Sequence, residues 1–186
     1  ITNALDQKLQ ELKKGHSKVI EEGHTLILGW NERVVEILRE LILANESEPH
    51  PCVVILSTRD KEFMDDFLKV HLPDTKNTRV VTRSGAISSL VNLEIVSVDS
   101  SKSVIVLAEC SPGANDSQKQ ASDAMVIKTV LAVVASRSDA QKMNIVAEVF
   151  DERNRKIVEE ISPEEVTTVD TDDILACIRR LAERQG

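Results

Sequence analysis

Short, continuously apolar runs alternate along the chain with longer stretches in which apolar residues recur every three or four positions. An apolar run of about four to eight residues bounded by polar residues is typical of a strand buried on both faces, and the wider spacing is typical of a helix that buries one face. The pattern therefore predicts six strands, at 25–30, 52–57, 79–82, 103–108, 144–150 and 165–169.

Helical patterns fill the intervals between these strands. Alternating strands and helices form a parallel, doubly wound α/β sheet with helices on both faces, and right-handed crossovers give it the Rossmann-like strand order 3-2-1-4-5-6. Residues 23–186 are thus predicted to form one such domain, with a six-stranded sheet. Over 4–22, Leu5, Leu9 and Leu12 recur at near-helical spacing, so a lead-in helix is expected before the first strand.

Charge and cysteine content narrow the classes of partner. The net charge of −8 argues against nucleic acid, because proteins that bind a phosphate backbone cluster Lys and Arg. Cys52, Cys110 and Cys177 lie far apart without CxxC spacing, so neither a zinc site nor a disulfide framework is predicted. No apolar run reaches the roughly 18 residues of a membrane span. Because the sequence opens on Ile1 rather than Met, we expect it to be a segment of a longer protein.

The stretch "TLILGWNERVVEIL" is similar to the start of a dinucleotide-binding fold. In the GxGxxG fingerprint the first glycine makes a tight turn, the second admits the pyrophosphate, and the third lets the helix pack on the strand. Here these positions are Gly29, Asn31 and Val34. The second strand ends on Ser57 or Thr58, followed by Arg59 and Asp60, so no carboxylate lies squarely where one would bind the ribose. The sequence therefore disfavours NAD(H), although the helix start, with Asn31 as its expected N-cap, still offers N–H groups to an anion.

Acidic residues follow several predicted strands, at the edge where open α/β sheets bind ligands. A long polar loop is predicted over 109–123. A structural interpretation is also open, in which Asp123 caps a helix at 124–136 and Asp151 with Glu152 begins the next helix. Oxygen ligands from several loops would instead suit Ca²⁺. The candidate Ca²⁺ ligands are Glu109, Asp116, Asp123, Glu148 and Asp151.

Catalytic motifs are missing from the sequence. GxSxG, the phosphate-binding GxxxxGK[ST] and HExxH do not occur. The histidines are His16, His24, His50 and His71. None of them is predicted to lie at the carboxyl end of a strand beside a nucleophile, and no second region is present to bind the substrate of a dehydrogenase. We therefore expect a binding domain rather than an enzyme.

The segment "LKKGHSKVIEEGHTLILGWNERVVEIL" closely resembles the stretch that leads from the pore into the cytosolic domain of the CASTOR/POLLUX family of cation channels. The resemblance implies an RCK domain (regulator of potassium conductance), with a linker helix from the pore over 1–22. It further implies a Rossmann-like N-terminal RCK lobe over 23–186 and a C-terminal lobe beyond residue 186. The likeness continues through "TRDKE" at 58–62, "TRSG" at 82–85, "VSVDSSKSVIVLA" at 96–108, "SDA" at 122–124 and "VAE" at 146–148.

This resemblance implies a cytosolic regulatory domain that couples an ion or small ligand to pore opening. Its partners would be other RCK lobes in a homo-oligomeric gating ring and the channel's own transmembrane pore. The membrane would be the plasma membrane in a prokaryote and the nuclear envelope if the protein is plant-like. Assembly is expected through exposed apolar faces of the helices at 90–98, 124–136 and 173–182.

The alternatives are an NAD(P)-binding, TrkA-type regulator of a potassium transporter, an oxidoreductase fragment, and a scaffold that binds nothing. No cofactor is certain; Ca²⁺ is the ion considered, and NAD(H) is disfavoured. The predicted ligand-binding residues are Gly29, Trp30, Asn31, Arg83, Ser84, Glu109, Asp116 and Asp123.

Overall fold

Six parallel strands form one sheet in the order β3-β2-β1-β4-β5-β6, which confirms the predicted topology. The computed structural model describes residues 15–137 and 142–183. β1, β4 and β5 each end earlier than predicted, so the residues after them form loops at the carboxyl edge of the sheet. The strands are β1 (Thr25–Leu28), β2 (Cys52–Ser57), β3 (Arg79–Ser84), β4 (Ser103–Val106), β5 (Asn144–Glu148) and β6 (Val166–Val169).

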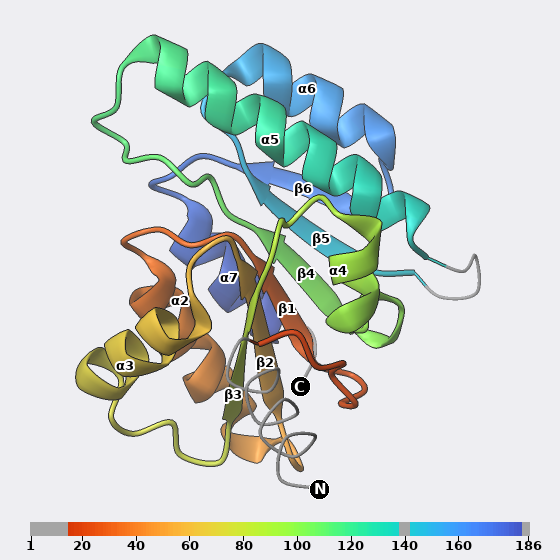
Figure 1. Ribbon diagram of the computed structural model, residues 1–186. Helices are drawn as coiled ribbons and strands as arrows, with labels where there is room; N and C mark the ends of the chain where they lie inside the picture. The colour runs from red at the N-terminus through yellow and green to blue at the C-terminus, as the bar shows by residue number, and fades with distance from the viewer. Residues whose placement is uncertain (1–14, 138–141, 184–186) are drawn as a thin grey trace, which may run out of the picture.

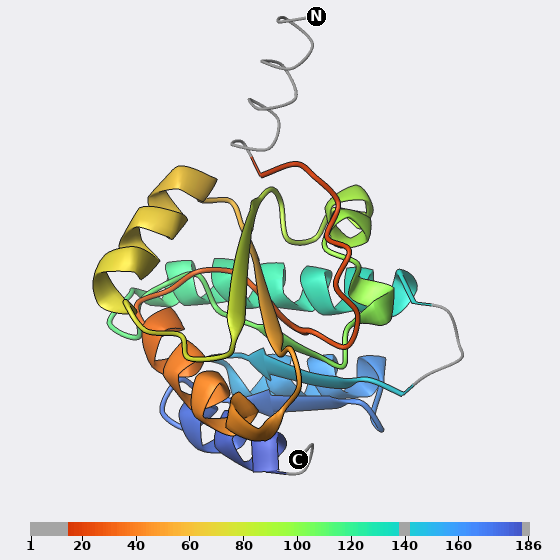
Figure 2. The same cartoon turned by 90° about the horizontal axis from the view of Figure 1, so that it is seen from below.

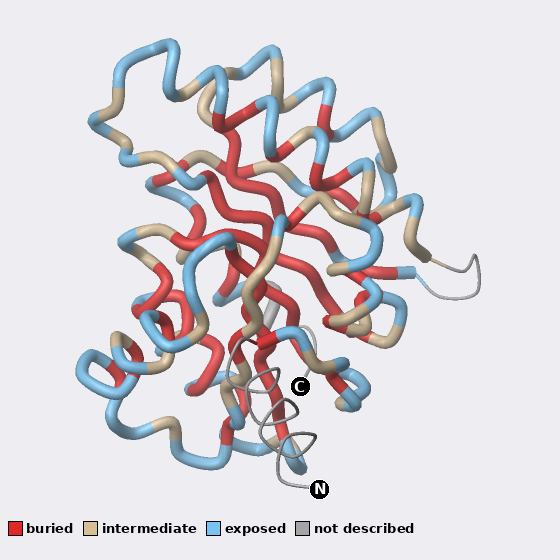
Figure 3. Tube along the Cα trace, viewed as in Figure 1, coloured by how far each residue is buried: buried red, intermediate tan, exposed pale blue. Residues whose placement is uncertain are grey.

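Helices cover both faces of this sheet (Figure 1). One face carries α4 (Leu90–Ile95), α5 (Asp116–Ala135) and α6 (Glu152–Ile161). The opposite face carries α2 (Val34–Ala44), α3 (Lys61–His71) and α7 (Ile174–Glu183). Two short 3₁₀ helices, η1 (Asn45–Ser47) and η2 (Val98–Ser100), follow α2 and α4. In Figure 3 the inner strands β1, β2, β4 and β5 are buried almost throughout, the edge strands β3 and β6 are only partly buried, and the outer faces of the helices are exposed.

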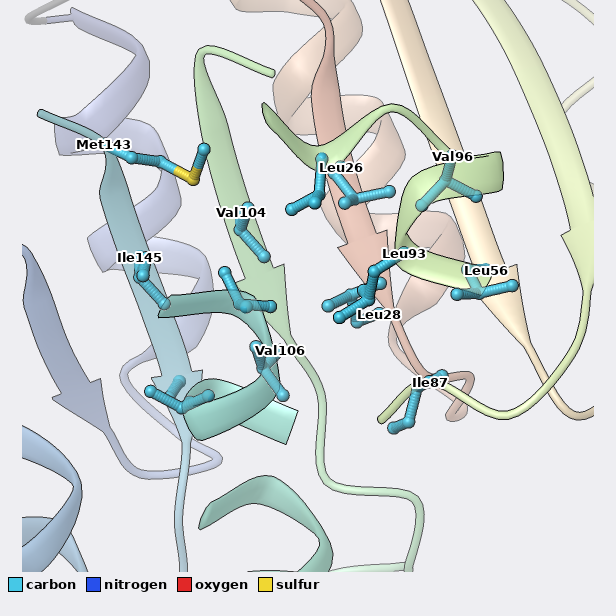
Figure 4. Close-up of a cluster of buried hydrophobic side chains, with 14 of the residues drawn as sticks. Leu26, Leu28, Leu56, Ile87, Leu93, Val96, Val104, Val106, Met143 and Ile145 are labelled. Carbon is cyan, nitrogen blue, oxygen red and sulfur yellow. The ribbon is translucent and has the colours of Figure 1, made fainter. Parts of the chain in front are cut away.

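The central strands supply two hydrophobic cores at once. Leu26 and Leu28 point towards α4, α5 and α6, where they pack with Val104 and Val106 of β4 (Figure 4). Ile27 points the other way, into the core beneath α2, α3 and α7. Because side chains alternate between the faces of a strand, a strand covered on both faces must be apolar at every position. The continuous apolar runs in the sequence follow from this arrangement.

α5 begins earlier than the sequence predicts. Asn115 and Gln118 form a capping box: the Asn115 Oδ1 accepts from the Gln118 N–H at 2.9 Å, and the Gln118 Oε1 accepts from the Asn115 N–H at 3.2 Å. Two otherwise unpaired groups at the helix start are thereby satisfied. The predicted loop over 109–123 is therefore wrong in its second half, and Asp123 lies inside the helix instead of capping it.

The chain before β1 is extended where a helix was expected. We call residues 15–24 the strap. Gly15 and Gly23, which have φ of +74° and +65°, lie near its two ends, and the strap runs alongside α4 (Figure 2). The predicted lead-in helix is thus wrong for residues 15–22, and its earlier part lies outside the described residues. No helix within 15–137 and 142–183 is both long enough and apolar enough to cross a membrane.

Candidate functional site

The loops that follow β1 and β4 meet at the point where the strand order reverses, which is where open α/β sheets bind ligands. Gly29 has a φ of +106°, and a Cβ added there would lie 2.9 Å from the carbonyl oxygen of Leu107. Residues that carry a side chain rarely adopt this backbone conformation. The loops after β1 and β4 also approach too closely to leave room for a Cβ. The single glycine left from the fingerprint is therefore required by the fold itself.

Asn31 ties three strand ends together across this point. Its Nδ2 donates to the carbonyl oxygen of Ala108 at 3.0 Å and to the Glu148 Oε2 at 2.9 Å. The Ala108 N–H donates to the same carboxylate oxygen at 3.0 Å. Asn31 is not the N-cap of α2, which is Arg33, but its Oδ1 accepts from the Arg33 N–H at 3.0 Å. A protein side chain thus lies across the turn where a pyrophosphate would need bare backbone.

Glu148 is a buried carboxyl group at the end of β5, with only 1 % of its surface exposed. Burial raises its pKa, and this effect outweighs the opposing influence of the Ala108 N–H and of the nearby Arg33 guanidinium. The Arg33 side chain, itself mostly buried, also lies 3.6 Å from the exposed carboxylate of Asp172. The network therefore joins the start of α2 to the loop before α7, and its charge depends on pH.

Replacing Glu148 by glutamine should abolish a pH dependence of stability. An amide oxygen can still accept from the Ala108 N–H and carries no charge to desolvate. Because the folded-state pKa of Glu148 is raised, its contribution to stability is fully present below the unfolded pKa of 4.5 and is lost as pH rises through the folded pKa. Urea unfolding between about pH 4 and pH 8 should show that the free energy of unfolding of Glu148→Gln increases relative to that of the wild type as pH rises. A constant difference across that range would contradict the assignment.

An aromatic cluster flanks the switch point. The Trp30 ring meets those of Phe67 and Phe63 edge-on, at centroid distances of 5.5 and 6.3 Å. The Arg59 guanidinium lies 5.9 Å from the centroid of Phe63, whose side chain is half exposed. Partial burial raises the pKa of Glu109, and the nearby positive charge of Arg59 offsets part of this rise. Trp30 and Glu109 are among the predicted ligand-binding residues, whereas the sequence pattern singles out neither phenylalanine for that role.

Arg83 and Ser84, predicted to bind ligand, lie at the end of the edge strand β3. The Arg83 Nε donates to the carbonyl oxygen of Ser17 at 2.7 Å, and its Nη1 donates to the carbonyl oxygen of Thr82 at 2.8 Å. A Cβ on Gly15 would lie 3.2 Å from the Ser84 nitrogen. The structure therefore brings these two residues against the strap and not to the switch point.

Asp116, Asp123 and Asp151 line one open hollow of about 360 Å³ between α5 and α6. The Asp123 carboxylate is fully buried and accepts, each at 2.9 Å, from the N–H groups of Phe150 and Asp151 and from the Asn154 Nδ2. Asp151 is the N-cap of α6 and accepts from the Arg153 N–H at 2.7 Å. The structural interpretation is therefore confirmed for Asp151, and Asp123 supports the start of α6 from the side.

The five candidate calcium ligands do not converge. Glu148 belongs to the Asn31 network and Glu109 to the aromatic cluster, while the other three lie around the hollow. Asp123 and Glu148 already accept hydrogen bonds from protein donors. Within the part of the chain that the structure describes, no three His, Cys, Asp or Glu side chains are grouped to hold a metal ion. The residues present thus do not fit a Ca²⁺ site of the predicted composition.

Comparison with known proteins tests the resemblance to the CASTOR/POLLUX family. No protein-family model matches the chain. The ion channel CASTOR of Lotus japonicus is 34 % identical over all 186 residues, and the probable ion channel POLLUX of Arabidopsis thaliana is 33 % identical over 94 % of the chain. The chain is homologous to one segment of the CASTOR and POLLUX channels. It spans about one fifth of their length, 21 % of that CASTOR and 20 % of that POLLUX.

Solved structures share the fold of this CASTOR/POLLUX homologue. The GsuK channel bound to NAD has a TM-score of 0.52 and 20 % identity, covering 89 % of this chain and 25 % of the channel. The human SLO3 gating ring has a TM-score of 0.53 and 16 % identity, covering 78 % of this chain and 24 % of the ring chain. The predicted Rossmann-like architecture is therefore confirmed, and the relatives are ion channels rather than enzymes.

Proposed function

We propose that this chain is the cytosolic, ligand-sensing N-terminal RCK lobe of a CASTOR/POLLUX-like cation channel, and that it couples ligand binding to pore opening. The observation that carries the proposal is homology along the whole chain to channels of that family. The Rossmann-like fold, shared with a gating ring, supports the role. The membrane would be the plasma membrane or the nuclear envelope, according to the organism.

The ligand class that the site supports best is an adenine nucleotide bound off the usual pyrophosphate seat. A planar base would rest on the half-exposed Phe63 ring beside Arg59, with Trp30 behind it. Stacking between a base and an aromatic ring contributes about 1 to 3 kcal/mol in other proteins. A structural neighbour, GsuK, is bound to NAD in one structure and to ADP in another. Asn31 keeps the diphosphate of either ligand out of the usual pyrophosphate seat, and ADP has no nicotinamide riboside to place beyond it, so ADP is expected to bind better than NADH.

Self-association is the second part of the proposal. Leu90 and Val91 on α4 and Leu131 on α5 are at least half exposed, and they form the apolar surface we assign to contact with another copy. α7 is not used in this way, because its Ile174 and Ile178 are buried against the core below α2. The face of α7 that carries Ile174 and Ile178 is therefore not available for assembly, contrary to what is expected for the helix at 173–182.

A thermal-shift series tests the ligand. ADP at about 100 times its Kd should raise the free energy of unfolding by about 2.7 kcal/mol, and hence the melting temperature by roughly 5 to 11 °C for a chain of this length. Phe63→Ala should remove most of that shift, whereas Val70→Ala, an exposed change on the same helix, should leave it intact. Equal shifts in all three proteins would contradict the aromatic platform. A shift with Ca²⁺ alone would favour the ion instead.

The channel role needs a separate experiment. The matched segment of Lotus japonicus CASTOR is replaced by residues 1–186, and currents are recorded in planar bilayers with ADP, NADH or Ca²⁺ added to the side of the domain. We expect a conducting chimaera whose open probability changes with at least one of these ligands. A chimaera that conducts but responds to none of them, when native CASTOR assayed alongside responds to at least one, would contradict the sensing role.

A further inference from the structure

The strap is docked by its middle and its C-terminal end on α4 and η2. The Val19 N–H donates to the carbonyl oxygen of Ile95 at 2.7 Å, and the Ser97 hydroxyl donates to the carbonyl oxygen of Val19 at 2.6 Å. The Val19 side chain is buried in the core beneath α4. Near β1 the Gly23 N–H donates to the carbonyl oxygen of Ser100 at 2.7 Å. The hydrogen bond between the His24 Nε2 and the Val96 carbonyl oxygen, 3.0 Å long, adds to these contacts and to the buried Val19 side chain in anchoring this half.

The N-terminal end of the strap has a different kind of attachment. Its strongest contact is the hydrogen bond from the half-buried Arg83 guanidinium to the Ser17 carbonyl oxygen. The neighbouring Lys18 side chain forms only an exposed pair with Glu94 at 3.7 Å, which contributes little. Hydrogen bonds from charged donors are stronger than those between neutral groups. Arg83 is therefore the main polar clamp on residues 15–18.

The strap also connects the two edges of the sheet. Gly23 and His24 lie at the amino edge, where the Lys102 N–H donates to the His24 carbonyl oxygen just before β4. Gly15 lies at the carboxyl edge, beside Ser84 and the first residue of α3, Lys61. The chain entering the domain thus passes the edge at which open α/β sheets bind ligands. The N-terminal end of the strap and the carboxyl end of β3 therefore share contacts, at Arg83 and Ser84.

We propose that the strap is a releasable element and that Arg83 is the latch that keeps it docked on β3. Opening requires that Arg83 lose the Ser17 carbonyl, that Val19 leave its pocket and that the hydrogen bonds of Val19 with Ile95 and Ser97 break, while the six strands stay paired. Its regulatory meaning rests on the proposed function: a ligand that reorganises the carboxyl edge would alter the hold on the chain that enters the domain. Whether the strap opens locally does not depend on that function.

Trypsin cleavage after Lys18 measures the opening, because a protease needs several residues free of the domain and the Lys18 side chain is exposed. In the full 186-residue chain, Arg83→Gln should accelerate this cleavage by about tenfold, the equivalent of losing one hydrogen bond to a charged group. The matched control is Arg79→Gln. Arg79 also lies on β3 and also contacts the strap, through an ion pair with Glu21, but its side chain is 69 % exposed. Less than a twofold change is expected there.

Val19→Ala and hydrogen exchange complete the test. Removal of the buried anchor should also accelerate cleavage, and amide exchange in β2 and β4 should stay slow in all variants, which separates strap opening from global unfolding. Faster cleavage in Val19→Ala but not in Arg83→Gln would overturn the latch. Faster exchange in β2 and β4 that parallels the cleavage would overturn the strap as an independent element. Neither outcome would bear on the ligand or channel experiments.

Discussion

Gly29→Ala is expected to be the most destabilising single-methyl substitution in this domain. The backbone at Gly29 has a φ of +106°, and the added Cβ would lie 2.9 Å from the Leu107 carbonyl oxygen and 3.3 Å from its Cβ. Conformational strain of about 1 to 3 kcal/mol then adds to a steric conflict of about 1 to 3 kcal/mol with backbone that cannot rotate away. We expect a loss of about 3 kcal/mol or more, measured by urea unfolding.

Gly23→Ala is the matched control. Gly23 also has positive φ, +65°, but a Cβ there would meet nothing within 4 Å. Only the left-handed conformation is then penalised, by about 1 kcal/mol. The difference between the two variants isolates the close approach of the loops after β1 and β4. Equal losses would mean that the two loops can separate at little cost and that the switch point is not rigid.

Asp123→Ala is expected to have the second largest effect. The buried carboxylate accepts from the N–H groups of Phe150 and Asp151 and from the Asn154 amide, each at 2.9 Å. A buried donor left without its acceptor costs about 1 to 3 kcal/mol. Because two backbone donors lose their partner together, we expect a loss of about 3 kcal/mol in the free energy of unfolding.

Asp123→Asn and Asp116→Ala distinguish this structural role from metal binding. An asparagine offers one acceptor oxygen where two backbone N–H groups need one each, so it should recover only part of the loss. Asp116 lines the same hollow but is exposed in the first turn of α5, so its replacement should change stability by no more than about 0.5 kcal/mol. If Ca²⁺ stabilised the wild type and Asp116→Ala abolished that effect, the hollow would be a metal site after all.

Periodicity in the sequence predicts the sheet well because burial on both faces leaves a strong signal. β2 has the predicted bounds of 52–57, and all six strands and their order follow from alternation and crossover handedness. α5 was harder to delimit, because its first two turns are polar and only the capping box at Asn115 marks the start. For the strap, by contrast, the sequence carries a helical signal where the structure has an extended segment. Leucines spaced as in a helix precede it, but Gly15 interrupts the pattern, and the extended form follows from contacts with distant residues.

The site could be predicted only as far as local patterns extend. The change from glycine to Asn31 indicates that the pyrophosphate seat is altered, yet its bond to Glu148 joins residues 117 positions apart. The Arg83 contact with Ser17 spans 66 positions. Such pairs leave no periodic trace in a single sequence, and an acidic residue at a strand end is equally compatible with a ligand and with a cap. Tertiary contacts decided between those roles.

Trp30 makes the switch point optically distinct from the rest of the molecule. It is the one tryptophan in a chain without tyrosine, and it is nearly buried at the edge where Arg59, Phe63 and Phe67 gather. Intrinsic fluorescence of the native sequence therefore arises almost entirely from this position, and no label or engineered probe is needed. Its emission would follow events at the candidate ligand site and remain insensitive to distant changes that leave the surroundings of Trp30 intact.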